Sequence, residues 1–284
     1  MEIINRRQRM FSISRKLRRE EKTVGFVPTM GALHEGHLSL VREARARCDI
    51  VIVSIFVNPE QFNDPADLER YPRDLTADAA TLAEVGVDYV FAPDAEEIYA
   101  PGFATYVDVE GIAETLEGAS RPGHFRGVAT VVTILLNTIR PNLAFFGQKD
   151  AQQVAVVKRL VTDLGFETEI VVMPTVREGS GLALSSRNEL LTPEDREKAA
   201  AIINALRDAK TAFKQGQRNA AELTKIVEDR ISEEPAARLD YVTVVDSETL
   251  QPVEKIGDVE TLILAAAYIG DIRLIDNVIL NRKQ

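Results

Sequence analysis

Between Thr23 and Met173 the apolar positions follow two alternating patterns. Short runs that are apolar at nearly every position are typical of strands buried on both faces. Longer segments, in which apolar residues recur every three or four positions, are typical of helices with one buried face. The predicted strands are Thr23–Pro28, Asp49–Val57, Tyr89–Ala92, Leu143–Phe146 and Thr168–Met173, and the predicted helices are His37–Arg47, Leu75–Val85, Val128–Ile139 and Ala151–Leu164.

This alternation predicts an α/β fold, a Rossmann-like doubly wound parallel sheet with right-handed crossovers. After Val176 the pattern changes to a Gly- and Ser-rich loop over Val176–Asn188, followed by an α+β segment. We expect residues 1–175 to form a Rossmann-like nucleotide-binding domain and residues 176–284 a smaller C-terminal α+β lid domain. In the second domain we predict helices over Pro193–Lys214 and Ala220–Ser232 and strands over Tyr241–Val245, Thr261–Ala267 and Ile272–Leu280.

The composition is that of an ordinary globular protein, with 284 residues, 45% of them apolar and 27% charged. The net charge of −10 argues against nucleic acid as a partner. Cys48 is the one cysteine, which excludes an intrachain disulfide and a cysteine zinc site. The longest apolar runs are too short to span a membrane. The basic run from Arg6 to Arg19 lacks a following apolar segment, so we interpret it as a solvated helix face and expect a cytoplasmic protein.

The most informative segment is Pro28–His37, which follows the first predicted strand and begins the first predicted helix. Ligands of open parallel sheets bind beyond the carboxyl ends of strands, and a helix N-terminus attracts anions. Gly31 and Gly36 permit a close backbone approach. His34 and His37 are three positions apart, so both imidazoles can face one ligand and donate to phosphate oxygens. The alternative for the glycines is that they only form a tight turn, and the alternative for the histidines is a metal site with two ligands.

Several strings in this chain resemble those of one enzyme family. His34-Glu35-Gly36-His37 matches the H-x-G-H signature of nucleotidyltransferases and class I aminoacyl-tRNA synthetases. The longer string FVPTMGALHEGHLSL is similar to that of the pantothenate synthetases, or pantoate–β-alanine ligases, and so are SIFVNPEQF, YPRD, RPGHFRGVATVV, FFGQKDAQQ and LSSRN. The resemblance implies ATP-dependent condensation of (R)-pantoate with β-alanine through a pantoyl-adenylate, with release of pyrophosphate and AMP.

The resemblance also implies which residues bind ATP. Lys149 would reach the phosphates as a point charge, and Arg187 with the serines before it would hold the leaving pyrophosphate. A solvated strand-end lysine and an ordinary surface loop are the alternatives. The implied catalytic residues are His34, His37, Lys149 and Arg187. The implied ATP-binding residues are Met30, Gly31, Ala32, Leu33, His34, Glu35, Gly36, His37, Gly147, Gln148, Lys149, Asp150, Val176, Leu184, Ser185, Ser186 and Arg187.

The resemblance implies that the first domain, residues 1–175, binds pantoate as well as the nucleotide. It points to Gln61 and Gln153, whose amides can both donate to and accept from the hydroxyls and carboxylate of pantoate. Gln61 would also help to place β-alanine. The alternatives are a turn residue for Gln61 and an exposed helix residue for Gln153. Asn58, Arg121 and His124 match further positions of the pantoate pocket, and Asp78 is the candidate contact to Mg²⁺.

The chain departs from the family in the loop that usually reads D-G-L-A-M-S-S-R-N. Ser180 replaces the acid, and Leu184 replaces the methionine with a similar volume. The expected partners are ATP, pantoate, β-alanine, Mg²⁺ and a second copy of the chain in a homodimer, with no nucleic acid and no membrane. Three alternative functions stay open: another H-x-G-H nucleotidyltransferase, a non-catalytic nucleotide-binding sensor, and an RNA-binding synthetase relative, which the charge disfavours.

Overall fold

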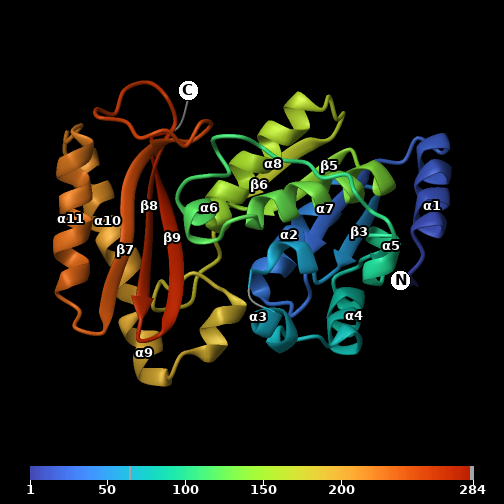
Figure 1. Cartoon of the computed structure of the whole chain (residues 1–284), viewed down its shortest axis with the longest axis horizontal. Coiled ribbons are helices and arrows are strands. Elements are labelled where there is room, and N and C mark those ends of the chain that lie inside the picture. Colours follow the sequence, from blue (N-terminus) through green and yellow to red (C-terminus); the bar gives the residue numbers. More distant parts are fainter. Residues whose placement is uncertain (64, 282–284) are drawn as a thin grey trace. The chain divides into compact units, whose positions relative to one another are not determined.

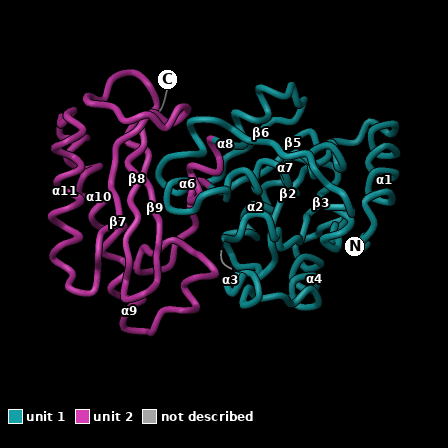
Figure 2. The backbone as a smooth tube through the Cα atoms, in the orientation of Figure 1, with its two compact units in different colours: residues 1–147, 156–173 teal, residues 148–155, 174–284 magenta. Residues whose placement is uncertain are grey.

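The computed structural model describes residues 1–63 and 65–281, and the chain divides into two compact units (Figures 1 and 2). The first unit comprises residues 1–147 and 156–173. The second comprises residues 148–155 and the chain from residue 174 onward. The domain boundary predicted after residue 175 stays a prediction, and the hydrophobic pattern did not single out residues 148–155.

The first unit is built on a six-stranded parallel sheet in the order β1-β4-β3-β2-β5-β6, flanked by helices (Figure 1). Strands β3 and β4 follow β2 on one side of the sheet, and β5 and β6 lie on its other side. The direction of the strand order therefore reverses between β2 and β5, and ligands of such folds bind at this reversal. This confirms the predicted doubly wound fold. The strands are β1 (Glu2–Ile4), β2 (Val24–Thr29), β3 (Ile50–Ile55), β4 (Tyr89–Phe91), β5 (Leu143–Gly147) and β6 (Glu169–Met173).

Helices α1, α2 and α4 of this unit bury one face each, α3 has no buried residue, and α7 is buried at nearly every position. The basic N-terminal run forms α1, whose apolar residues Met10, Ile13 and Leu17 are buried, so its basic residues form a solvated face as predicted. The helices are α1 (Arg7–Arg19), α2 (Glu35–Arg47), α3 (Pro65–Arg70), α4 (Leu75–Glu84), α5 (Ala95–Ile98), α6 (Glu117–Ser120), α7 (His124–Ile139) and the 3-10 turn η1 (Pro59–Gln61), while α8 (Ala151–Asp163) belongs to both units.

The second unit contains a three-stranded antiparallel sheet in the order β7-β8-β9, against which α10 and α11 pack. Its core includes Ile203, Leu206, Leu223 and Ile263. The predicted helix from Pro193 to Lys214 divides at Ala199 into two helices. The elements are β7 (Ala237–Asp246), β8 (Thr261–Ile269), β9 (Ile272–Asn281), α9 (Pro193–Lys198), α10 (Ala200–Lys214), α11 (Ala220–Ser232) and the 3-10 turns η2 (Gln148–Asp150) and η3 (Ser186–Leu190). No helix within the described ranges is long and apolar enough to cross a membrane.

Candidate active site

The turn after β2 is held by a carboxylate from α4. Oδ2 of Asp78 accepts the backbone N–H of Ala32 at 3.0 Å, and Oδ1 accepts that of Leu33 at 2.9 Å. Gly31 has a φ of +82°, and a Cβ there would lie 2.8 Å from Oδ2 of Asp78. Glycine is therefore required by the backbone conformation and by the close approach. Asp78, the candidate Mg²⁺ contact, is buried and fixes the shape of this turn.

His34 and His37 lie against each other at the start of α2, with ring centroids 4.1 Å apart. Nδ1 of His34 accepts the backbone N–H of Gly36 at 3.1 Å, and Nδ1 of His37 accepts that of His34 at 3.3 Å. Because an accepting ring nitrogen carries no proton, the hydrogen-bond network assigns the proton of each neutral imidazole to Nε2. Both histidines thus have an Nε2–H donor at a helix N-terminus, which suits an anion such as phosphate.

Glu35, between the two histidines, forms an ion pair with Arg42 two turns along α2. Hydrogen bonding to Arg42 lowers the pKa of the Glu35 carboxyl. The carboxylate is thereby engaged on the exposed side of the helix.

The predicted pantoate residues Asn58, Gln61, Arg121 and His124 meet at η1. Nδ2 of Asn58 donates to Oε1 of Gln61 at 3.1 Å. The backbone carbonyl of Gln61 lies 2.8 Å from Nδ1 of His124 and 3.2 Å from the Arg121 guanidinium. Nε2 of Gln61 lies 2.8 Å from the sulfur of Met30, in the turn after β2. Four of the five predicted pantoate residues therefore form one cluster.

Two residues that support this cluster were not predicted. The Tyr99 hydroxyl donates to Oδ1 of Asn58 at 2.7 Å, and burial raises the pKa of Tyr99 well above its usual 10.0. Gly127 of α7 accepts from Nδ2 of Asn58 at 3.1 Å, and a Cβ on Gly127 would lie 2.2 Å from the carbonyl oxygen of Glu60. Gly127 belongs to the string RPGHFRGVATVV and directly precedes the predicted helix Val128–Ile139, whereas nothing near Tyr99 in the sequence links it to Asn58.

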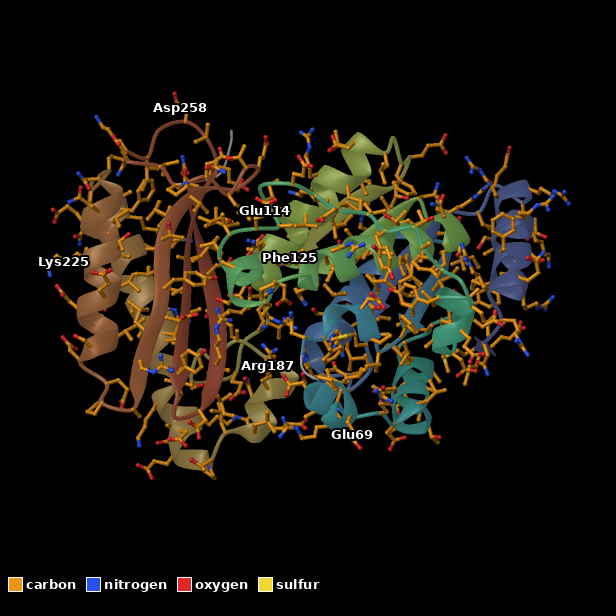
Figure 3. All side chains as sticks on the ribbon, viewed as in Figure 1. Glu69, Glu114, Phe125, Arg187, Lys225 and Asp258 are labelled. Atoms are coloured by element: carbon orange, nitrogen blue, oxygen red, sulfur yellow. The ribbon has the colours of Figure 1, made fainter. Side chains whose placement is uncertain are left out.

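The second unit carries its own group of predicted residues. Lys149, Ser185 and Arg187 line one cavity together with Ala183 and Asn188. The Lys149 ammonium lies 3.5 Å from Oδ1 of Asp150, and Arg187 is exposed (Figure 3). Arg273 and Asp276 also line this cavity, and its cations and the Ser185 hydroxyl are suited to phosphate oxygens.

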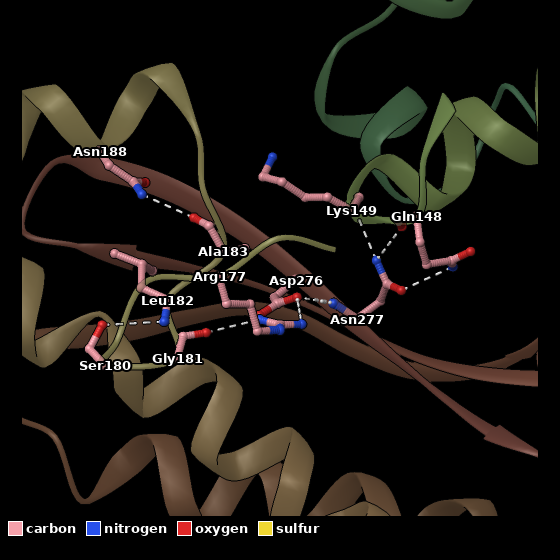
Figure 4. Close-up of polar contacts among 10 residues, drawn as sticks. All are labelled: Gln148, Lys149, Arg177, Ser180, Gly181, Leu182, Ala183, Asn188, Asp276 and Asn277. Atoms are coloured by element: carbon pink, nitrogen blue, oxygen red, sulfur yellow. Dashed lines mark hydrogen bonds and ion pairs between the residues drawn. The ribbon is translucent and has the colours of Figure 1, made fainter. Parts of the chain in front are cut away.

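The segment before Arg187 is a hydrogen-bonded hairpin. The N–H of Glu178 donates to the carbonyl of Leu182, and the N–H of Leu184 donates to that of Val176. Arg177 pairs through both terminal nitrogens with Asp276 of β9, at 2.6 and 2.9 Å, and also donates to the carbonyl of Gly181 (Figure 4). The predicted loop is therefore a loop ordered by hydrogen bonds around an isolated antiparallel bridge between Arg177 and Ala183.

A second anchor lies just after Arg187. Nδ2 of Asn188 donates to the carbonyl of Ala183 and to Oε1 of Glu178, both at 3.0 Å. Arg196 of α9 also binds the Glu178 carboxylate, and this hydrogen bonding lowers the pKa of Glu178. The ends of the hairpin are thereby joined to the residue that follows Arg187.

A profile of the family described as pantoate-beta-alanine ligase matches residues 2–279. The chain belongs to the pantoate–β-alanine ligase family. It is an ATP-binding ligase of pantothenate biosynthesis.

Individual members of the family align with nearly the whole chain. Pantothenate synthetase of Thermotoga neapolitana is 51% identical over 280 residues, which is 99% of this chain and 100% of the relative. The crystal structure of pantothenate synthetase from Thermus thermophilus matches with a TM-score of 0.92, at 45% identity over 99% of both chains. The pantoate-beta-alanine ligase of Francisella tularensis, complexed with beta-gamma ATP and beta-alanine, matches with a TM-score of 0.79 at 41% identity, over 99% of this chain and 98% of that one.

The site residues that the family resemblance implies lie in both compact units. The histidine turn and the cluster around Gln61 belong to the first unit, and Lys149, Gln153 and Arg187 belong to the second. Gln153 is half-buried in the first turn of α8. Gln148 lies apart from the Lys149 cavity and contacts Asn277 of β9.

Proposed function

We propose that the protein condenses (R)-pantoate with β-alanine through a pantoyl-adenylate and converts ATP to AMP and pyrophosphate. The observation that carries the proposal is the pair of Nε2–H donors on His34 and His37 at the N-terminus of α2. This arrangement suits the phosphates of a nucleotide. The ATP analogue and β-alanine bound to the Francisella tularensis relative support the same substrates.

In the first half-reaction, a carboxylate oxygen of pantoate attacks the α-phosphorus of ATP. The bond between that phosphorus and the bridging oxygen breaks, and pyrophosphate leaves with the electron pair. Nε2–H groups of His34 and His37 donate to phosphate oxygens, and Lys149 and Arg187 offset the charge that develops on the leaving group. The cluster of Asn58, Gln61, Arg121 and His124, together with Gln153, orients pantoate for the attack.

In the second half-reaction, the amine of β-alanine attacks the acyl carbon of the adenylate. The C–O bond to AMP breaks, and the amine loses a proton as the amide forms. Gln61 helps to orient β-alanine in this step. No triphosphate is present by then, so Lys149 and Arg187 matter less in this half-reaction than in the first.

The proposed Mg²⁺ is best regarded as bound to the nucleotide. Among the described residues, no three His, Cys, Asp or Glu side chains gather to hold a metal ion. Both oxygens of Asp78 already accept backbone N–H groups. Mg²⁺ typically keeps several waters and binds substrate phosphates together with one or two protein carboxylates. Asp78 would be the carboxylate that this site supplies to the ion. When bound, the ion would neutralise phosphate charge.

Isotope exchange tests the adenylate route. Labelled pyrophosphate should enter ATP in the presence of pantoate alone, and omission of pantoate should abolish the exchange. AMP should accumulate in multiple turnovers only when β-alanine is also present. Exchange that required β-alanine, or AMP release without pantoate, would refute the proposal.

We also infer a homodimer assembled through the first unit. Light scattering at micromolar concentration should give twice the chain mass of 31.4 kDa. A mass near that of one chain would contradict the inference.

A further inference from the structure

Asn277 of β9 makes its side-chain contacts with a turn about 130 residues earlier in the chain. It is 3% exposed. Its Nδ2 donates to the backbone carbonyls of Gln148 and Lys149 at 2.9 and 3.0 Å, and its Oδ1 accepts from Nε2 of Gln148 at 3.1 Å (Figure 4). The turn between β5 and α8 is therefore held by one side chain of the C-terminal strand.

These contacts use both N–H groups of the Asn277 amide. Two carbonyl oxygens can be satisfied only by the nitrogen end of the amide, so its orientation is determined by its surroundings. The 3-10 turn η2 spans Gln148–Asp150 and leads directly into α8. The backbone at Lys149 is therefore held by a donor from outside the turn.

The Lys149 side chain extends away from Asn277 (Figure 4) and lines the cavity that Ser185 and Arg187 also line. Asn277 is absent from that lining, so its effect on the ammonium would pass through the backbone of the turn. The neighbouring Asp276 holds Arg177 at the base of the hairpin that leads to Arg187. Two successive residues of β9 thus contact the turn that carries Lys149 and the loop that leads to Arg187.

We propose that Asn277 is a positioning residue for Lys149, acting through the carbonyls of Gln148 and Lys149. The inference rests on the role of Lys149 proposed above. A catalytic group displaced by about 1 Å can lose on the order of 100-fold in rate. Asn277→Ala should therefore slow pantoyl-adenylate formation by about 10- to 100-fold in single-turnover assays. The reaction of β-alanine with supplied pantoyl-adenylate should change by no more than about threefold, because it contains no triphosphate.

Three further variants separate positioning from general stability. Asn277→Asp keeps the shape but places an oxygen against two carbonyls, and it should be at least as slow as Asn277→Ala. Asn281→Ala is the matched control, since Asn281 also lies on β9 and its amide also bonds backbone groups, those of Gly257 and Thr261, away from η2. Asn281→Ala should change the rates of the two half-reactions to the same extent. Asn277→Ser keeps one donor and serves the same comparison if Asn277→Ala does not fold.

A double-mutant cycle provides the decisive measurement. If Asn277 acts through Lys149, Asn277→Ala should slow Lys149→Ala by no more than about twofold, because coupled residues are not additive. Independent, multiplicative losses, or an equal loss in both half-reactions for the Asn277 variants, would overturn the inference and leave the role of Lys149 intact. If Lys149→Ala itself slows both half-reactions equally, the proposed role of Lys149 fails and the inference fails with it.

Discussion

Replacing Tyr99 by Phe removes a single hydroxyl from the cluster around Gln61. The hydroxyl donates to Oδ1 of Asn58 at 2.7 Å, and Asn58 in turn donates to Gln61. Phenylalanine retains the ring contacts with Phe56 and Phe103, whose centroids lie 6.3 and 5.0 Å from that of Tyr99. The change therefore tests the orientation of the Asn58 amide with little change in packing.

The structure sets the size of the expected effect. A neutral hydrogen bond contributes about 0.5–1.5 kcal/mol. Oδ1 of Asn58 keeps the N–H of Glu60 at 3.3 Å, so it is not left unsatisfied, and we expect the lower half of that range, about 0.5–1 kcal/mol. This corresponds to a rise of about two- to fivefold in the KM for pantoate.

Steady-state kinetics with pantoate and ATP varied in turn measure the effect. The KM for ATP should stay within experimental error. Burial raises the pKa of Tyr99 above 10.0, so the hydroxyl stays protonated and the variant-to-wild-type ratio should be constant from about pH 6 to 9. Tyr106→Phe is the control, because Tyr106 makes an edge-to-face contact with Phe103 and has no hydrogen bond to Asn58. Equal changes in both KM values, or a change for Tyr106→Phe of the same size, would refute the reasoning.

Two further substitutions test the pantoate assignment. Gly127→Ala would place a Cβ 2.2 Å from the carbonyl oxygen of Glu60, so chemical denaturation should show a loss of about 1–3 kcal/mol and kinetics a higher KM for pantoate; a stabilised variant would contradict the close approach. Gln153→Ala should raise the KM for pantoate about two- to fifteenfold while the KM for ATP is unchanged. Equal losses for both substrates would mean that Gln153 supports the fold.

Hydrophobic periodicity predicted most of the architecture because the central parallel strands of the first unit are buried on both faces. Val51, Ile52 and Val53 of β3, for example, are fully buried. The periodicity did not predict β1, because Glu2–Ile4 is a three-residue edge strand paired only with β4, too short for a pattern. It indicated a loop after Val176, but not the hydrogen bonds, the Arg177–Asp276 ion pair and the burial of Leu182 that order this loop.

The candidate site was predictable where chemistry is local in the sequence. His34 and His37 are three positions apart in one turn, and their rings lie against each other as that spacing allows. Residues whose contacts span long separations in the sequence could hardly be identified from the sequence pattern. Asn277 is 128 residues from Lys149, and its one indication is a pair of polar residues, Asp276 and Asn277, inside an apolar strand. Such contacts depend on tertiary packing, which no local pattern encodes.

The final prediction concerns acid sensitivity of the hairpin before Arg187. Hydrogen bonding to Arg196 holds the pKa of Glu178 below its usual 4.5, so the pair stabilises the hairpin above that pH and the contribution is lost as pH falls through the folded-state value. Near neutral pH, Glu178→Gln should therefore speed hydrogen exchange at the two backbone amides that bond across the hairpin, those of residue 178 and Leu184. In acid, the difference in exchange rate between the variant and the wild type should vanish. Arg196 is 46% exposed, so salt should weaken the effect, and we expect only about two- to fivefold lower protection. Glu194→Gln, which makes the same charge change in an exposed pair of α9, is the control. A difference that does not decrease as the pH is lowered from neutral through and below 4.5 would show that the carboxylate charge does not hold the hairpin.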